Sequence, residues 1–117
     1  MKVLILAAGE GRRLRPLTTK TPKPAVKVCG VPLIVRNCSI LKELGLEIYV
    51  VVGYKAEEII SILDKDIQVI YNDNIKKGNA YSVFCARNLL KDEKNFLVLM
   101  GDHLYSCLLY TSDAADE

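Results

Sequence analysis

Four short runs of mostly apolar residues recur along the chain, and this pattern limits the possible folds more than any other feature. The runs are Lys2–Leu6, Ile48–Val52, Ile67–Tyr71 and Phe96–Met100. Segments with helical periodicity lie between them, namely Pro32–Leu44, Ala56–Leu63 and Asn79–Leu90. Strands that are apolar throughout are typical of parallel sheets covered on both faces. Strands alternating with helices therefore predict an α/β domain with a parallel sheet.

The first and third helical segments carry more detailed expectations. Pro32 is predicted in the first turn of its helix, and Gly45 is predicted as the residue that ends it. The third segment is expected to face the core through four positions. These are Ala80, Val83, Phe84 and Leu90.

Composition narrows the class of protein. The chain has 117 residues, of which 50% are hydrophobic and 26% charged, as in one folded globular domain. The net charge of +2 does not indicate a nucleic-acid-binding protein, so no nucleic acid partner is expected. The four cysteines lack metal-type spacing and only His103 could join them, which argues against zinc. Scattered cysteines and the short first apolar run predict a cytoplasmic protein without a signal peptide.

The last eleven residues, 107–117, differ from the rest. They match what one reading frame of a common sequencing-library adaptor would encode, although a natural C-terminal turn is the alternative. We therefore expect residues 1–106 to be the N-terminal part of a truncated domain. Residues 107–117 are then a tail that is not native.

A long loop with glycines and cations follows the first apolar run. Gly9 and Gly11 allow a backbone to approach a ligand closely, and three prolines exclude a regular helix from Gly9 to Lys27. The three arginines and the lysines of this loop suggest an anion with several phosphates. Ligands of parallel sheets lie beyond the carboxyl ends of the strands, where the strand order reverses. This rule selects the loops that follow Leu6, Gly53, Tyr71 and Met100.

The order of residues in this loop allows a narrower interpretation. The segments Leu6–Leu14, Pro16–Thr18 and Pro22–Pro24 together resemble the signature of the sugar-phosphate nucleotidylyltransferases. The resemblance implies a Rossmann-like three-layer sandwich with a mostly parallel sheet. Gly78–Ser82 and Gly101–Tyr105 are similar to the branch that uses CTP, which includes the inositol-1-phosphate and phosphocholine cytidylyltransferases.

The resemblance implies roles for individual residues. Arg13 would contact the leaving pyrophosphate, and Lys23 would stabilise charge on the α-phosphate, so both are catalytic candidates. Asp102 would hold Mg²⁺, the expected cofactor. The nucleotide would be bound by Leu6, Ala7, Ala8, Gly9, Gly11, Asn72, Asp73 and Gly78.

Each candidate also has a purely structural interpretation. Asn72 and Asp73 have the composition of a polar turn, Lys23 could be a solvated loop cation, and Asp102 could be a turn or cap residue. Tyr81 and Ser82 either face the nucleotide or pack. The roles of Arg12 and Arg15 stay open, and His103 is given no catalytic role.

The expected reaction transfers CMP from CTP to a phosphorylated alcohol or sugar such as inositol 1-phosphate and releases pyrophosphate. The alternatives are a hexose-1-phosphate uridylyl-, thymidylyl- or guanylyltransferase, or a non-catalytic nucleotide-binding domain. A dinucleotide-binding module is disfavoured because Leu14 stands where a third glycine belongs, and no P-loop motif occurs. Some inositol-phosphate members are fused to a membrane-embedded transferase, which stays open here. The truncated chain itself is expected to be weakly active or inactive.

Overall fold

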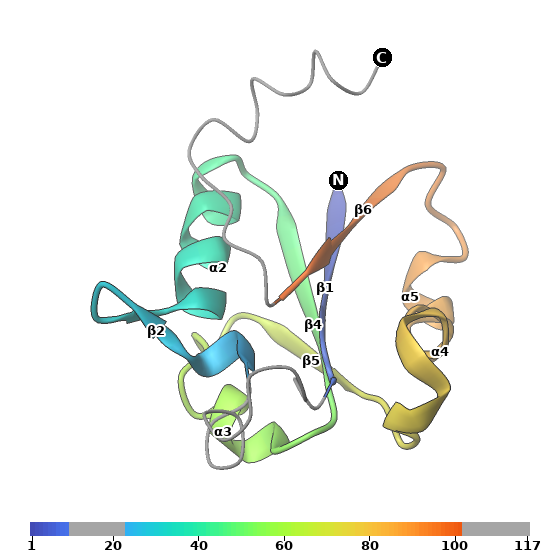
Figure 1. The fold of residues 1–117 in the computed structure, drawn as a ribbon. Coiled ribbons are helices and arrows are strands. Elements are labelled where there is room, and N and C mark those ends of the chain that lie inside the picture. The colour runs from blue at the N-terminus through green and yellow to red at the C-terminus, as the bar shows by residue number, and fades with distance from the viewer. Residues whose placement is uncertain (10–22, 102–117) are drawn as a thin grey trace.

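The computed structural model describes residues 1–9 and 23–101 (Figure 1). Four parallel strands form its main sheet, as predicted. They are β1 (Lys2–Ala7), β4 (Glu47–Val52), β5 (Gln68–Tyr71) and β6 (Phe96–Met100).

The strand order places β1 inside the sheet. The order is β5-β4-β1-β6, so the chain builds outwards from β1 on one side and then crosses to the other side for β6. Leu6 pairs with Val51 of β4 and with Met100 of β6. The strand order therefore reverses between β1 and β6, and the carboxyl ends of these strands lie side by side.

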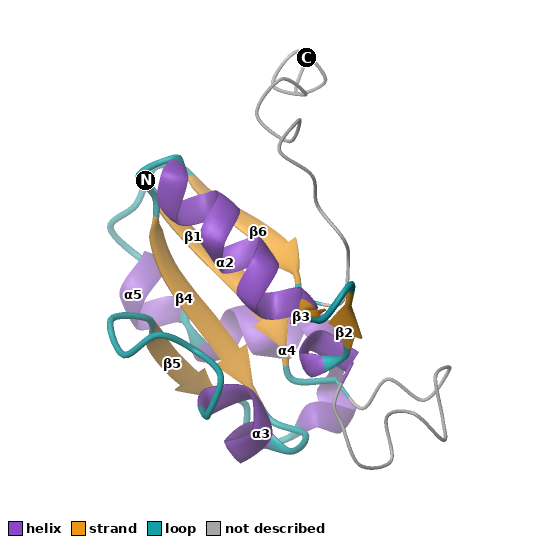
Figure 2. Ribbon diagram, turned by 90° about the vertical axis from the view of Figure 1, so that its left-hand side faces the viewer, coloured by secondary structure: helices purple, strands orange, loops and turns teal. Residues whose placement is uncertain are grey.

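Helices cover both faces of the sheet, which gives three layers (Figures 1 and 2). On one face lie α2 (Leu33–Glu43) and α3 (Ala56–Ile60), and on the other lie α4 (Gly78–Cys85) and α5 (Arg87–Leu90). The predicted three-layer α/β sandwich is confirmed.

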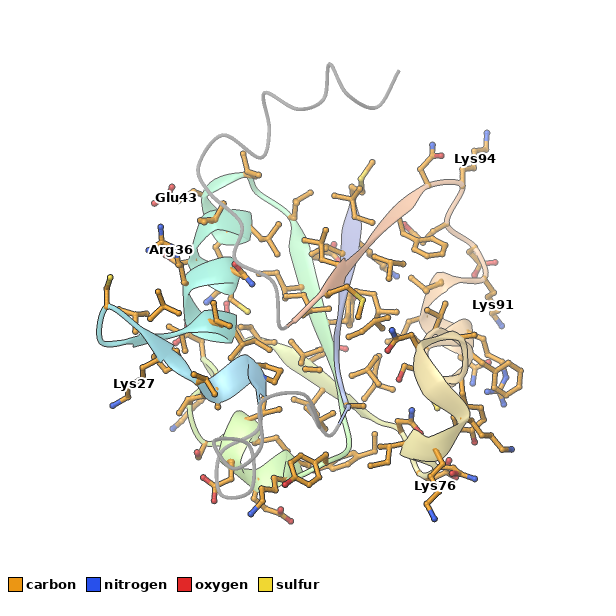
Figure 3. All side chains as sticks on the ribbon, in the orientation of Figure 1. Lys27, Arg36, Glu43, Lys76, Lys91 and Lys94 are labelled. Atoms are coloured by element: carbon orange, nitrogen blue, oxygen red, sulfur yellow. The ribbon has the colours of Figure 1, made fainter. Side chains whose placement is uncertain are left out.

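The residues of β1 alternate between the two halves of the core. Val3, Ile5 and Ala7 pack with α2 and α3, whereas Leu4 and Leu6 pack with the face covered by α4 and α5. Complete burial of such a side chain contributes about 1.5–3 kcal/mol, so the central strand anchors both layers. By contrast, the labelled charged side chains of Figure 3 lie at the periphery of the molecule.

The ends of α2 follow the sequence closely. Pro32 adopts extended backbone angles (φ −58°, ψ 140°) just before the helix, one position earlier than predicted. At the other end Gly45 has φ +75°, and its N–H donates to the carbonyl of Lys42 at 3.0 Å. The Leu46 N–H donates to the Leu41 carbonyl at 3.3 Å, which completes a Schellman motif. The prediction that Gly45 ends this helix is confirmed.

Two helices depart from their predicted extent. α3 ends at Ile60, short of the predicted Leu63. The third helical segment breaks at Ala86 (φ −95°, ψ 7°) into α4 and α5. The predicted core face was wrong at Ala80 and at Phe84, whose side chain is 51% exposed. Ser82 is buried instead, because a loop residue supplies its hydrogen-bond partner.

A small hairpin was not predicted. β2 (Lys27–Val28) pairs antiparallel with β3 (Val31–Pro32) through a two-residue turn, Cys29–Gly30. Before it lies the short 3₁₀ helix η2 (Lys23–Ala25), which packs against α2 and α3. A second 3₁₀ helix, η3 (Ile75–Lys77), leads into α4.

Within the described ranges, no helix combines the length and the apolar character that a membrane crossing requires.

Candidate nucleotide-binding site

Three loops meet where the central strands end. The Gly101 N–H donates to the Leu6 carbonyl at 2.8 Å, and the Tyr54 N–H donates to the Ala8 carbonyl at 3.0 Å. The end of β1 is therefore tied to the residue after β6 on one side, and the start of the loop after β1 is tied to the loop after β4 on the other. This is the edge that the sequence rule selected.

The residues at this edge are small because the backbones approach closely. A Cβ atom at Gly53 would collide with the Ile75 side chain and come within 3.1 Å of the Ala8 Cβ. A Cβ atom at Gly101 would lie 3.0 Å from the Leu6 carbonyl oxygen and 3.2 Å from the Ala7 Cβ. Both glycines are thus required by packing alone.

Gly9 differs from these two glycines. A Cβ atom there would meet no described atom within 4 Å, and its φ angle is not positive. Leu6, Ala7 and Ala8, by contrast, bury their side chains in the core. The three predicted residues before Gly9 therefore position the loop, and Gly9 itself carries no packing constraint from the described residues.

Asn72 is held firmly in the loop after β5. Its side chain is 5% exposed, and Nδ2 donates to the Ser82 Oγ of α4 at 2.8 Å. Its Oδ1 accepts from the Asn74 N–H at 2.7 Å, and its own N–H donates to the Val52 carbonyl at 2.8 Å. These three bonds give Asn72 a structural role in the loop, and its contact with the nucleotide stays a prediction.

Asp73 is exposed and has a different partner. The Tyr81 hydroxyl of α4 donates to the Asp73 Oδ1 at 2.7 Å. The hydrogen bond to this carboxylate raises the pKa of Tyr81, because loss of the phenolic proton would place two negative charges together. The hydroxyl therefore stays a donor at neutral pH.

The start of α4 lies close to the end of β6. Gly78, with φ +84°, turns the chain into the helix, and the Asn79 Nδ2 lies 3.9 Å from the Met100 Sδ. No side chain caps the first turn. The Gly78 N–H at the start of α4 donates to the Ile75 carbonyl of η3, so the two helices join without a break.

Several predicted residues lie outside the described ranges, among them Gly11, Arg13, Asp102 and His103. The structure places the backbone of Lys23 at the first position of η2. Asp102 follows Gly101 directly in sequence. Among the described residues, no three His, Cys, Asp or Glu side chains gather into a metal-binding group.

Two hollows of about 310 Å³ each lie away from this edge. One is lined by the starts of β4 and β5, and the other lies between α2 and the chain after α3. Their surroundings include the Lys42 ammonium, which pairs with Asp64 and Asp66. The hydrogen bond from Lys42 lowers the pKa of Asp66. These groups join α2 to the loop before β5 and have no connection with the candidate site.

Sequence reasoning missed the contacts from α4 to the loop after β5. The acids and amides of the loop were visible, but their partners Tyr81 and Ser82 were left between two interpretations. Tyr81 and Ser82 are adjacent on a helix and so point in different directions. Whether each of them reaches the loop is known only once the helix is placed on the sheet.

The fold and this edge define a class: a three-layer α/β protein with a parallel sheet whose ligand edge lies at the reversal of strand order. A family model described as "Nucleotidyl transferase" matches residues 2–115. The chain belongs to that family.

Individual relatives agree with the family assignment. The chain is 41% identical over 100 residues to the bifunctional protein GlmU of Thermoanaerobacter pseudethanolicus, covering 85% of this chain and 21% of the relative. It is 35% identical over 114 residues to the UTP–glucose-1-phosphate uridylyltransferase AglF of Haloferax volcanii, covering 93% of this chain and 46% of the relative. The chain thus spans less than half the length of both relatives.

Two solved structures are similar at moderate identity. The CTP:phosphocholine cytidylyltransferase LicC of Streptococcus pneumoniae matches with a TM-score of 0.74 and 36% identity, over 86% of this chain and 44% of that chain. The inositol-1-phosphate CTP transferase of T. maritima matches with a TM-score of 0.73 and 29% identity, over 96% of this chain and 47% of that chain.

Proposed function

We propose that this chain carries the nucleotide-binding part of a nucleotidyltransferase that transfers CMP from CTP to a phosphorylated alcohol or sugar. The observation that carries the proposal is the seam between β1 and β6. There β1, the strand that leads into the loop starting at Gly9, is tied to the residue that precedes Asp102, through the bond from the Gly101 N–H to the Leu6 carbonyl. A triphosphate needs this combination of close backbone, cations and a carboxylate.

Each candidate residue would act on a different part of the triphosphate. The N–H groups at Gly9 and Gly11 would hold the triphosphate, and Arg13 would pair with the β- and γ-phosphate oxygens. An oxygen of the acceptor's phosphate attacks the α-phosphorus, the bond from that phosphorus to the bridging β-oxygen breaks, and pyrophosphate leaves. Lys23 would neutralise the charge that builds on the α-phosphate, since such transfers depend on positioning and electrostatics.

The implied Mg²⁺ fits the donor chemistry of one candidate residue. Asp102 would hold it, because a carboxylate at the end of an apolar strand must be solvated, paired or bound to a metal. When bound, the ion supplies charge neutralisation between phosphate oxygens.

The base preference rests on the loop after β5. Asp73 offers an exposed carboxylate, which accepts a hydrogen bond from the 4-amino group of cytosine and repels the 4-carbonyl of uracil. The two solved relatives named for CTP support this choice. A uridylyltransferase is the second candidate, since a relative of 35% identity is named for UTP. The acceptor is a small phosphorylated molecule such as inositol 1-phosphate, phosphocholine or a hexose phosphate.

Calorimetric titration of the 117-residue chain tests the proposal. CTP, UTP, dTTP and ATP are compared in the presence of Mg²⁺, and we expect CTP to bind most tightly. Tighter binding of UTP would replace the cytidylyl assignment by the uridylyl one. Failure of all four nucleotides to bind would contradict a nucleotide site at this edge.

A further inference from the structure

Two adjacent hydrogen bonds connect the loop after β5 to α4. Asn72 donates to Ser82 at 2.8 Å, and Tyr81 donates to Asp73 at 2.7 Å. The first bond is buried, because Asn72 and Ser82 are 5% and 2% exposed. The second lies at the surface. The buried bond fixes where the loop sits on the helix, and the exposed bond acts on a carboxylate that is open to a ligand.

The ring of Tyr81 is itself held in place. The Lys77 Nζ lies 4.7 Å from its centroid, and the Phe84 ring stacks on it with centroids 5.9 Å apart and planes inclined by 26°. Arg87 covers Phe84 at 4.0 Å and donates to the Phe84 carbonyl at 3.0 Å. This stack of alternating cations and rings lies on the exposed side of α4. It buries little apolar surface, but it restricts the direction in which the Tyr81 hydroxyl points.

We propose that Tyr81 is a positioning residue, which sets the base preference of the site by holding the Asp73 carboxylate through its hydroxyl. The inference rests on the proposed nucleotide-binding function and adds a residue to it. Tyr81 donates to Oδ1, and Asp73 has no second partner among residues 1–9 and 23–101. The other carboxylate oxygen is therefore available to a donor on the ligand.

The chemistry follows from what each group can donate. The Tyr81 hydroxyl fixes the rotation of the carboxylate, so that the free oxygen presents a lone pair in one direction. The exocyclic amine of cytosine donates to such an oxygen, while the carbonyl of uracil has no proton to give. Without the hydroxyl, the carboxylate rotates and is hydrated, and its contribution to discrimination falls.

The test measures the ratio of dissociation constants for UTP and CTP by calorimetry on the 117-residue chain with Mg²⁺. Tyr81→Phe keeps the ring and the stack but removes the hydroxyl. We expect it to weaken CTP binding by about 3- to 10-fold, the usual worth of one hydrogen bond, and not to weaken UTP binding. Tyr71→Phe is the matched control, because it removes a hydroxyl from a neighbouring tyrosine that is 63% exposed.

A second variant makes the inference independent of how well Tyr81→Phe folds. Asp73→Asn keeps the size of the side chain and offers both a donor and an acceptor. It should therefore also reduce the ratio of the dissociation constants for UTP and CTP. The double variant should be no less selective than Asp73→Asn alone, because the hydroxyl acts only through the carboxylate. Fully additive losses, or an unchanged ratio in Asp73→Asn, would overturn the inference.

The remaining outcomes distinguish failure of the inference about Tyr81 from failure of the proposed nucleotide-binding function. If the parent chain prefers CTP and Tyr81→Phe keeps that preference, Tyr81 is only structural, and the proposed function stands. If the parent binds CTP and UTP equally, both the inference and the choice of CTP fail, while a nucleotide site remains. If it binds neither, the proposed function fails and the inference fails with it.

Discussion

Two glycines at the carboxyl edge of the sheet show how a packing requirement can be told apart from a ligand requirement. Gly53 has close neighbours that a side chain would meet, whereas a Cβ atom at Gly9 would meet no atom of the described residues within 4 Å. The sequence predicted a ligand role for Gly9 and none for Gly53, but it gave no packing reason for either glycine. The distances from the surrounding atoms supply that reason for Gly53.

This difference gives a direct prediction for Gly9→Ala. The free energy of unfolding, measured in urea, should change by no more than about 0.5 kcal/mol, because the new methyl group meets no atom of residues 1–9 and 23–101. The affinity for CTP should fall, because the methyl group occupies space that the phosphates need.

Gly53→Ala serves as the reverse control. Its methyl group would collide with Ile75, so the free energy of unfolding should fall by about 1–3 kcal/mol. A stable Gly9→Ala variant with unchanged CTP affinity would remove Gly9 from the site.

The cysteines give a second prediction at this scale. Burial raises the pKa of the Cys38 thiol to about 12, whereas Cys29 lies exposed in the hairpin turn. The thiolate is the reactive form, so iodoacetamide at pH 8 should modify Cys29 and spare Cys38 in the folded chain. Peptide mass spectrometry measures both, and labelling in urea should make them equal. Rapid modification of Cys38 in the native chain would mean that α2 does not pack as described.

Among the secondary-structure elements, the strands were predicted well and the small hairpin was missed. Long apolar runs specify buried strands directly, but β2 and β3 have two residues each and no such run. Their turn places Cys29 at φ +53° and Gly30 at φ +83°, as a type I′ hairpin requires. Asn-Gly would have signalled this turn, and Cys-Gly does not.

The hairpin therefore predicts that Cys29→Asn stabilises the chain. Asparagine tolerates a positive φ better than cysteine, so the free energy of unfolding should rise by about 0.5 kcal/mol. Urea denaturation of the two chains under reducing conditions provides the comparison. A lower stability would show that the turn does not form with these angles in solution.

The buried face of α4 shows why the packing of this helix could not be predicted from the sequence. Apolar spacing assigned Phe84 to the core, yet the buried position belongs to Ser82, whose partner Asn72 lies in the preceding loop. Helical periodicity counts apolar residues and cannot register a polar residue that is satisfied by a distant amide. The break at Ala86 then rotates the remaining turn.

At the scale of the whole molecule, the parallel sheet and its ligand edge followed from the order of strands and helices. The position of β6 beside β1 depends on a crossover that local patterns do not encode. In the described ranges β6 pairs only with β1, and its Leu97 and Val98 are 40% and 41% exposed. An apolar edge strand with a free side is a template for pairing with another chain.

We therefore expect the 117-residue chain to self-associate through β6. Val98→Lys should lower the association, measured by sedimentation velocity at several concentrations, because a charge on the edge opposes pairing. Leu44→Lys is the control, since Leu44 is 41% exposed but lies at the end of α2. Equal effects of both variants would point to general hydrophobicity rather than to the strand edge.

The place of β1 in the sheet also has a consequence for folding order. Lys2 of β1 pairs with Glu47 of β4 and with Phe96 of β6. Since β6 lies near the end of the described chain, β1 can pair on its second side only after nearly all of these residues have been synthesised. Contacts between distant parts of a chain are slow to form, because the intervening segment must be closed into a loop. We therefore expect β1 to pair with β4 before it pairs with β6 during synthesis. The candidate site lies on that seam, so we expect the chain to acquire it only when β6 is in place.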